Sequence, residues 1–205
     1  MSRIRRGIDL VFALLWLGLT APLMLLIAHL IKLESPGSVL FSQPMVGQNG
    51  KVFLLFRFRT MFADRSEGRA EQRLTRVGAL IRDLSFDHLP MLINLLKGDL
   101  TLVGPRPMEI GVVDFEDDVW QQYFQVRPGL FNYAVLKLGK SWTPSRASRP
   151  SLNQALELEY QQKRSSITDL QLLIQFLIAY IKSQGNVKAR GTPDLEAETK
   201  LSTSE

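Results

Sequence analysis

The feature of the sequence that most constrains its fold is a long apolar run near the start of the chain. From Leu10 to Ile31 the sequence reads LVFALLWLGLTAPLMLLIAHLI, without Asp, Glu, Lys or Arg. An α-helix rises about 1.5 Å per residue, so a helix of this length would just cross a hydrocarbon core about 30 Å thick. The run is too long for the core of a signal peptide and no small-residue cleavage site follows it, so we expect a membrane element in the mature protein.

The flanks of this run leave its topology open. Arg3, Arg5 and Arg6 precede it, and the positive-inside rule places such residues in the cytoplasm. Pro22 interrupts the middle of the run, where it removes a backbone hydrogen bond and kinks a helix. Lys32 and further basic residues follow the run as well. From the residues alone, a spanning helix and a re-entrant element that returns to the same face are both compatible with this pattern.

The composition indicates one folded domain attached to the membrane element. The chain has 205 residues, of which 45% are hydrophobic, and 25 Lys and Arg against 20 Asp and Glu give a formal charge of +5. Acidic partners are therefore expected: nucleic acid, anionic lipid or phosphorylated small molecules. We expect no nucleic-acid partner, because no helix-turn-helix or basic-aromatic motif is present. The absence of cysteine excludes disulfides, thiolate metal sites and cysteine nucleophiles.

Periodicity predicts a chain of short elements after the apolar run. Turn signals at Pro36-Gly37 and Asn49-Gly50 flank β-like segments, and Val52 to Phe58 is predicted to be a strand. Residues 63–73 are polar and predict a mobile surface loop. We expect further elements as follows: a helix at 75–82, a strand at 101–103, and helices at 151–163 and 169–183. The last helix is apolar on most of its surface, which favours burial with one face at the membrane interface.

The segment SFDHLPMLINLLKGD, which starts at Ser85, predicts a capped helix that carries an acid at its start. Ser85 or Asp87 can cap a helix that begins near His88, with Pro90 in its first turn and Gly98 as its stop. Backbone N–H groups and the positive end of the helix dipole would then surround Asp87 and favour a bound anion. The alternative is that Asp87 is only a cap. One apolar stripe is expected on this helix: Leu89, Leu92, Ile93 and Leu96.

Arg106 is held between two prolines in the sequence GPRP. Pro105 and Pro107 fix φ on both sides, so the guanidinium is presented from a stiff segment with little loss of entropy. Such an arginine suits a phosphate or the edge of a nucleotide. The alternative is a plain turn.

Five segments together resemble the bacterial sugar transferases of the monotopic polyprenyl-phosphate phosphoglycosyltransferase family. They are RIRRGIDL, ESPGSVLFSQPMVGQNGKVF, FRFRTM, TRVGALIRDLSFDHLPMLINLLKGDLTLVGPRP and VRPGLFNYAVLKLGK, in this order. The resemblance implies an α/β fold in which a small, mostly helical cytoplasmic domain with short strands follows an N-terminal re-entrant membrane helix broken at Pro22. The expected boundaries are 1–33 for the membrane helix, 34–185 for the cytoplasmic phosphoglycosyltransferase domain and 186–205 for a disordered tail.

The same resemblance implies transfer of a phosphosugar from a UDP-sugar to a polyprenyl phosphate, such as undecaprenyl phosphate, with release of UMP. It places the protein in the bacterial inner membrane with the catalytic domain on the cytoplasmic face, with the lipid bilayer as a partner and a homodimer as a possible assembly. Asp87 matches the nucleophile, which would form a covalent aspartyl-phosphosugar, and also a ligand of Mg²⁺. His88 stands where the family has Glu and is assigned to the catalytic pair.

Because the family Glu is associated with Mg²⁺, which prefers oxygen ligands, His88 leaves three interpretations. Asp99 or Glu109 helps to hold the metal, or His88 is a general acid/base or a ligand of a different metal, or catalysis is impaired. The last interpretation corresponds to a membrane-bound relative that acts as a scaffold or regulator in a polysaccharide assembly system. The Asp-x-x-Tyr element of the family is only faintly echoed, by Glu159-Tyr160.

Four arginines match the substrate-binding positions of the family. They are Arg57, where the family has Lys, and Arg59, Arg106 and Arg127. Each planar guanidinium group can donate two parallel hydrogen bonds to phosphate oxygens. These four side chains are therefore expected to converge on one pocket that holds a diphosphate and a lipid phosphate.

Overall fold

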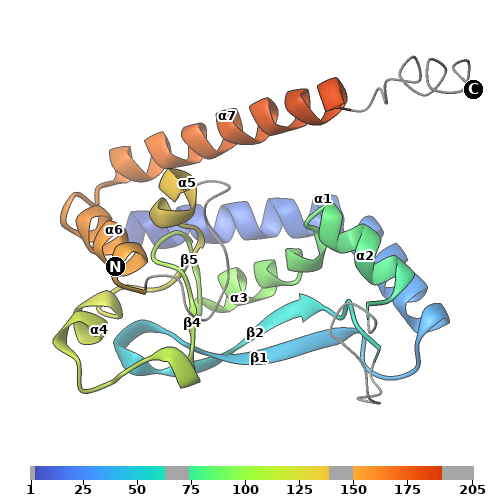
Figure 1. The fold of residues 1–205 in the computed structure, drawn as a ribbon, viewed down its shortest axis with the longest axis horizontal. Helices are drawn as coiled ribbons and strands as arrows, with labels where there is room; N and C mark the ends of the chain where they lie inside the picture. The colour runs from blue at the N-terminus through green and yellow to red at the C-terminus, as the bar shows by residue number, and fades with distance from the viewer. Residues whose placement is uncertain (1–2, 63–73, 139–149, 191–205) are drawn as a thin grey trace, which may run out of the picture.

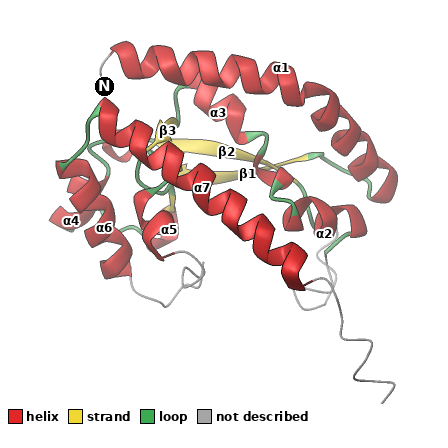
Figure 2. Cartoon of the chain, turned by 90° about the horizontal axis from the view of Figure 1, so that it is seen from above, coloured by secondary structure: helices red, strands yellow, loops and turns green. Residues whose placement is uncertain are grey.

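The computed structural model describes residues 3–62, 74–138 and 150–190, and it has a mixed helical and sheet fold. Its most extended element is α1 (Arg3–Glu34), which contains the whole apolar run and continues through Pro22. Figure 2 shows that α1 changes direction along its length, as expected for a helix with an internal proline. It is long and apolar enough to cross a membrane by length and composition.

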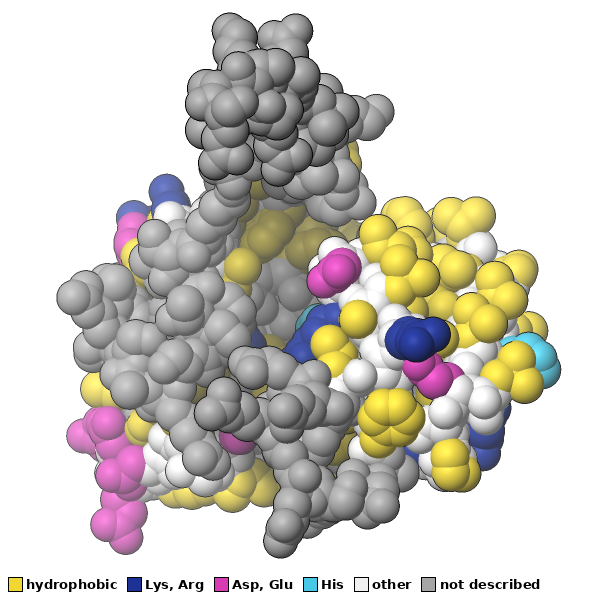
Figure 3. Space-filling model, turned by 45° about the vertical axis from the view of Figure 1, so that its right-hand side comes forward, with side chains coloured by type: hydrophobic (Ala, Val, Ile, Leu, Met, Phe, Trp, Pro, Cys, Tyr) yellow, Lys and Arg dark blue, Asp and Glu magenta, His cyan; other side chains and the backbone are white. Residues whose placement is uncertain are grey.

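Most apolar side chains of α1 are exposed, while one face packs on the rest of the protein. Ala13, Ile27 and Ile31 are buried in two hydrophobic clusters. Hydrophobic side chains also gather on one side of the space-filling view (Figure 3). The large apolar side chains that α1 exposes are Ile4, Ile8, Val11, Leu14, Leu15, Trp16, Leu19, Leu25, Leu26 and Leu33.

A β-hairpin forms the layer farthest from α7 in Figure 1. Strand β1 (Leu40–Val46) pairs antiparallel with β2 (Val52–Phe58), from Leu40 opposite Phe58 to Val46 opposite Val52. The Asn49-Gly50 turn signal is confirmed, because both residues adopt positive φ in the connecting 3₁₀ turn (Gln48–Gly50). Strand β4 (Met108–Glu109) pairs with the other edge of β1.

A second, parallel pair is formed by β3 (Thr101–Val103) and β5 (Gly129–Phe131). The two backbones come very close where this pair continues into the GPRP segment. A Cβ on Gly129 would lie 2.2 Å from the backbone nitrogen of Gly104, so only glycine fits there. This close approach places Arg106 just beyond the pair.

Helix α3 (Met91–Lys97) lies between the hairpin and α1 (Figure 1). Its side chain Asn94 is fully buried, donates to the carbonyl of Leu54 (2.6 Å) and accepts from the amide of Phe56 (2.9 Å), both on β2. The expected apolar stripe is wrong in part: Leu92 is buried, but Leu89, Ile93 and Leu96 are only half-buried. The buried face instead carries Met91, Leu92, Asn94 and Leu95, because α3 is covered on one side by α1 and on the other by β2.

The remaining helices surround these layers. Their bounds are α2 (Arg76–Asp83), α4 (Asp118–Tyr123), α5 (Tyr133–Leu138), α6 (Pro150–Gln162) and α7 (Ser166–Arg190), with 3₁₀ turns η3 (Phe86–His88) and η4 (Ile110–Val112). Helix α7 runs to Arg190, so the first residues of the stretch 186–205 are helical where disorder was expected. Residues 191–205 and the expected loop at 63–73 lie outside the described residues.

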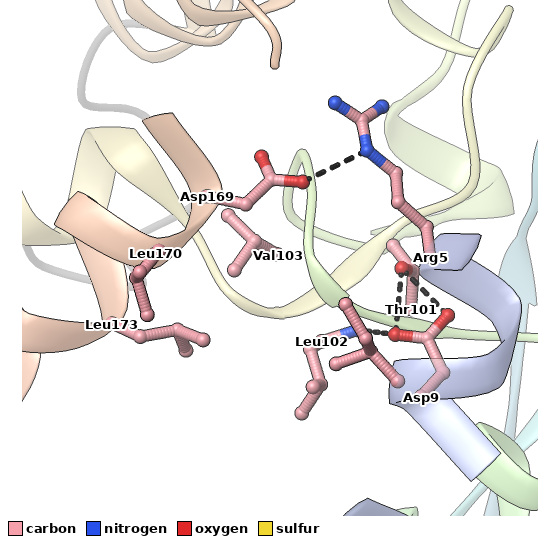
Figure 4. Close-up of a pocket in the computed structure, with 9 residues that line it drawn as sticks. Arg5, Asp9, Thr101, Leu102, Val103, Asp169, Leu170 and Leu173 are labelled. Carbon is pink, nitrogen blue, oxygen red and sulfur yellow. Dashed lines mark hydrogen bonds and ion pairs between the residues drawn. The ribbon is translucent and has the colours of Figure 1, made fainter. Parts of the chain in front are cut away.

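Polar contacts tie the first turns of α1 to the folded domain (Figure 4). Asp9 is buried and accepts hydrogen bonds from the Thr101 hydroxyl (3.0 Å) and the Leu102 amide (2.9 Å) on β3. Arg5 forms an ion pair with Asp169 on α7 (3.1 Å) beside a cavity of about 90 Å³. Because these groups are charged, the start of α1 belongs with the polar domain and not with the lipid core.

Candidate active site

Asp87 lies in the 3₁₀ turn η3, between α2 and α3, and is 6% exposed. The turn follows Ser85, which adopts a left-handed conformation (φ 59°). A helix was expected to begin near His88; Phe86–His88 form a 3₁₀ turn, and the α-helix begins only at Met91. Pro90 has no N–H to donate to an i−4 carbonyl, so the chain forms tighter i→i−3 bonds before the α-helix begins, as in the Leu89 amide to the Phe86 carbonyl (3.1 Å).

His88 contacts the acid directly. Its Nδ1 lies 2.8 Å from Oδ1 of Asp87, and its side chain is half exposed whereas that of Asp87 is almost buried. The hydrogen bond fixes one carboxylate oxygen. The two side chains are therefore hydrogen-bonded neighbours with the histidine on the solvent side, and their catalytic roles stay predictions.

Arg57 on β2 faces this acid. Burial lowers the pKa of its guanidinium, the nearby carboxylates of Asp87 and Glu109 oppose that shift, and Arg82 adds to it. The buried Nε of Arg57 makes no hydrogen bond with a described residue, which leaves a donor for a bound group. Arg57 thus interacts with two acids, one of which is the candidate nucleophile.

Arg106 is close enough to Arg57 for the two charges to interact. Burial lowers its pKa to about 10, and the positive charge of Arg57 acts in the same direction, while Tyr123, Glu109 and Glu157 oppose it. A cation whose pKa is lowered by a neighbouring cation is unfavourable by itself, but the same arrangement is favourable around a bound anion. The Tyr123 hydroxyl donates to the Arg106 carbonyl (2.9 Å) and so fixes the backbone of the Pro-Arg-Pro segment.

The other two predicted arginines lie elsewhere. Arg59 donates to the carbonyls of Ser35 (2.8 Å) and Pro36 (2.7 Å), so its guanidinium closes the turn between α1 and β1. Arg127 donates to Gln48 (3.3 Å) and lies beside Gly98, the residue that ends α3. Asp87 precedes the start of α3 and Arg127 lies at its end, so the two residues are separated by the length of that helix, about 10 Å.

Asp87, His88, Arg57 and Arg106 are thus connected by a hydrogen bond and by charge interactions. Arg59 and Arg127 donate their hydrogen bonds elsewhere. In Figure 3, Lys and Arg side chains line a hollow near the centre of the view. The substrate-binding roles of Arg59 and Arg127 stay predictions.

Glu157 on α6 is a site residue that the sequence reasoning missed. Its side chain is fully buried, accepts from the Ala134 amide (3.0 Å) and is close enough to Arg106 for the two charges to interact. Burial raises its pKa to about 8. The signal was the spacing: Glu157-x-x-Tyr160 has the separation of the Asp-x-x-Tyr element, whereas Glu159 is surface-exposed and pairs with Lys163 (2.7 Å).

The acids available for a metal ion are few. Among the residues that the structure describes, no group of three or more His, Cys, Asp or Glu side chains is placed to hold one. Of the two acids expected to help hold the metal, Glu109 interacts with the charge of Arg57, as Asp87 does. Asp99 accepts from Asn94 (3.0 Å) and pairs with Lys97 (3.3 Å) at the far end of α3.

Comparison with known proteins identifies the family. The sequence model of the bacterial sugar transferases matches residues 1–183. The chain belongs to the bacterial sugar transferase family. This confirms the resemblance drawn from the five sequence segments.

Named relatives of this bacterial sugar transferase act on undecaprenyl phosphate. It is 37% identical over 182 residues to a UDP-glucose:undecaprenyl-phosphate glucose-1-phosphate transferase of Caulobacter vibrioides, covering 83% of this chain and 67% of the relative. It is 41% identical over 145 residues to a UDP-N-acetylgalactosamine-undecaprenyl-phosphate N-acetylgalactosaminephosphotransferase of Aeromonas hydrophila, covering 66% of this chain. That match spans about a third of the Aeromonas relative (34%).

A third relative has nearly the same extent as this chain. The exopolysaccharide production protein PSS of Rhizobium leguminosarum is 31% identical over 189 residues, which covers 86% of this chain and 94% of the relative. The stretch of this chain that the family model matches includes Asp87 and Arg106.

Proposed function

We propose that this bacterial sugar transferase moves a phosphosugar from a UDP-sugar to a polyprenyl phosphate and so initiates a glycoconjugate or exopolysaccharide. The observation that carries the proposal is the buried Asp87 with Arg57 beside it and Arg106 next to Arg57. A nearly buried carboxylate next to two guanidinium groups suits a reaction in which an acid attacks a phosphorus atom between anionic oxygens. The relatives' names supply the substrate classes, a UDP-sugar and undecaprenyl phosphate.

The chemistry has two displacements at one phosphorus atom. A carboxylate oxygen of Asp87 attacks the β-phosphorus of the UDP-sugar, the bond from that phosphorus to the oxygen bridging to the α-phosphate breaks, and UMP leaves. The product is an aspartyl-phosphosugar. An oxygen of the polyprenyl phosphate then attacks the same phosphorus, the bond to the aspartyl oxygen breaks, and the Asp87 carboxylate is restored.

In this mechanism the guanidinium groups, and not a helix dipole, stabilise the negative charge on the phosphoryl oxygens. Asp87 precedes α3 by one 3₁₀ turn, so stabilisation of the phosphoryl oxygens falls mainly to Arg57 and Arg106. Charge-assisted bonds from such planar groups orient a diphosphate and offset the charge that develops on it. His88, by holding Oδ1 of Asp87, leaves Oδ2 as the attacking atom.

Mg²⁺ is part of the proposal, with Asp87 as the described residue that would hold it. Mg²⁺ commonly binds through one or two carboxylates together with substrate phosphates and water, so one protein acid next to a diphosphate fits its needs. When bound it would neutralise charge on the diphosphate. The role of His88 beside it stays that of a hydrogen-bond partner to Asp87.

Contacts at both ends of α1 support a re-entrant element. We place it on the cytoplasmic face of the inner membrane because the proposed donor, a UDP-sugar, is cytoplasmic. Near its start, Arg6 donates to the carbonyls of Leu95 (2.8 Å) and Leu96 (2.7 Å). At its end, Ile27 and Ile31 pack in the same cluster as Phe58 and Ile81. Since both ends of α1 rest against one domain, a bilayer does not fit between them, whereas a bent helix lying in one leaflet with its exposed apolar side chains does.

The transferase activity is tested with the purified full-length chain in detergent and a panel of UDP-hexoses and UDP-N-acetylhexosamines with Mg²⁺. We expect an intact-protein mass gain of one phosphosugar with the cognate donor. We also expect sustained UMP release once undecaprenyl phosphate is added. A chain that neither gains mass nor releases UMP with any donor of the panel would overturn the proposal.

His88 favours a second candidate function, that of a catalytically impaired scaffold or regulator, and His88→Glu separates the two. If the site is active, this change should lower turnover by about tenfold or more, because it removes a hydrogen bond to a charged group and puts a second carboxylate beside Asp87. The rate of UMP release is the measurement. A large gain in His88→Glu would instead identify a decayed site, and His88→Gln is the neutral control.

A further inference from the structure

We propose that Glu157 is a positioning residue whose protonation state controls how strongly Arg106 binds a phosphorylated ligand. The inference rests on the proposed function in that the ligand is the diphosphate of a UDP-sugar. Glu157 itself is enclosed by α6, α5 and α4 and acts through Arg106.

The position of Glu157 couples it to Arg106 in two ways. Its Oε1 accepts from the Ala134 amide at the start of α5, while Oε2 is buried without a hydrogen bond to a described residue. Helix α6 is also linked to the backbone of Arg106 through Tyr123. Gln161 on α6 donates to the Tyr123 carbonyl (2.9 Å), and the Tyr123 hydroxyl donates to the Arg106 carbonyl (2.9 Å). Helix α6 therefore helps to hold the Arg106 backbone through Tyr123, and it also carries Glu157, which interacts with the Arg106 charge.

The groups that face Glu157 are few among the described residues. Arg106 comes from the segment between β3 and β4, Tyr123 comes from α4, and α5 contributes the backbone N–H groups of Tyr133 and Ala134. Burial raises the pKa of Glu157 to about 8, against the lowering effects of the two N–H groups and of Arg106. Glu157 also raises the pKa of Tyr123, which burial already places well above its usual range.

The sign of the coupling follows from these charges. Below pH 8 Glu157 is mainly a neutral acid, so it does not offset the positive field of Arg106. Above pH 8 it becomes a carboxylate next to Arg106 and repels a phosphate that approaches the same guanidinium. By linkage, a bound diphosphate raises the pKa of Glu157 further, and protonation of Glu157 strengthens diphosphate binding by the same factor.

The test is the pH dependence of UDP binding to the full-length chain in detergent, measured by calorimetry between pH 7 and pH 9, which needs no turnover. We expect the Kd of the wild type to rise by about tenfold across this range, a typical size for coupling between two sites. In Glu157→Gln, which is neutral at every pH, the Kd should stay nearly constant until Arg106 itself titrates near pH 10. Glu159→Gln, an exposed acid on the same helix, should behave like the wild type.

Two results would overturn the inference. A wild-type Kd that does not change between pH 7 and pH 9 would contradict the inference, and this result does not depend on whether Glu157→Gln folds. An alkaline rise that persists unchanged in folded Glu157→Gln assigns the titration to another group. Failure of the proposed function is distinct, because it would show as UDP binding without an aspartyl adduct or UMP release.

Discussion

Asp87→Asn is expected to abolish sugar-phosphate transfer, with turnover reduced by about 10³-fold or more, because an amide is a far weaker nucleophile than a carboxylate. The side chain volume is kept, and the amide oxygen can still accept from His88, so the fold should persist. The measurement is paired: intact mass after incubation with the cognate UDP-sugar, and UMP release with undecaprenyl phosphate. Neither the adduct nor UMP should form.

The matched control for this change is Asp83→Asn. Asp83 is an exposed acid near the end of α2, four residues before Asp87, and its substitution makes the same change in net charge. It should retain transfer, and both variants should melt within a few degrees of the wild type. A phosphosugar adduct that persists in Asp87→Asn would assign the nucleophile to another residue and overturn the mechanism.

Arg106→Ala is expected to lower kcat/KM for the UDP-sugar by about 10²-fold or more, the usual effect of removing one group that stabilises developing charge. The hydrogen bond that anchors this segment uses the Arg106 carbonyl, which the substitution leaves in place. Arg106→Lys should recover part of the loss, since it restores the charge without the planar pair of donors. Steady-state UMP release over a range of donor concentrations is the measurement.

Arg59→Ala is the control that separates the two classes of arginine. It removes the bonds to the carbonyls of Ser35 and Pro36 that close the turn after α1, so the thermal unfolding midpoint should fall while KM for the donor stays near that of the wild type. If Arg59→Ala instead raised KM with unchanged stability, Arg59 would be assigned to substrate binding after all. If Arg106→Ala kept full kcat/KM, Arg106 would not contribute to substrate binding or catalysis.

Local signals were sufficient for several elements of the fold. The strand at Val52 to Phe58 is confirmed at both ends, and the strand at Thr101 to Val103 likewise. The helix expected at residues 75–82 is present, with Thr75 as its cap, because a side-chain cap and the spacing of apolar residues are properties of neighbours in the chain. Gly98 ends α3 with a positive φ of 88° for the same reason.

The start of α3 shows the limit of such signals. Asp87 and Ser85 both suit a cap, and nothing local indicates that Pro90 shifts the α-helix to Met91 and leaves Asp87 in a 3₁₀ turn. The buried face of α3 could not be read from its apolar residues either. Asn94 is buried because two β2 backbone groups pair with it, and that pairing exists only after β2 has folded against the helix.

The sequence by itself determined the family, the apolar helix at the start of the chain, and the two motifs that carry Asp87 and Arg106, because each depends on residues close together in the chain. Tertiary structure decided which charges meet. It assigned Arg59 to the turn after α1 and Arg127 to the far end of α3, and it buried Glu157 beside Arg106. These outcomes depend on contacts between residues distant in sequence, where burial and neighbouring charge set the state of each ionisable group.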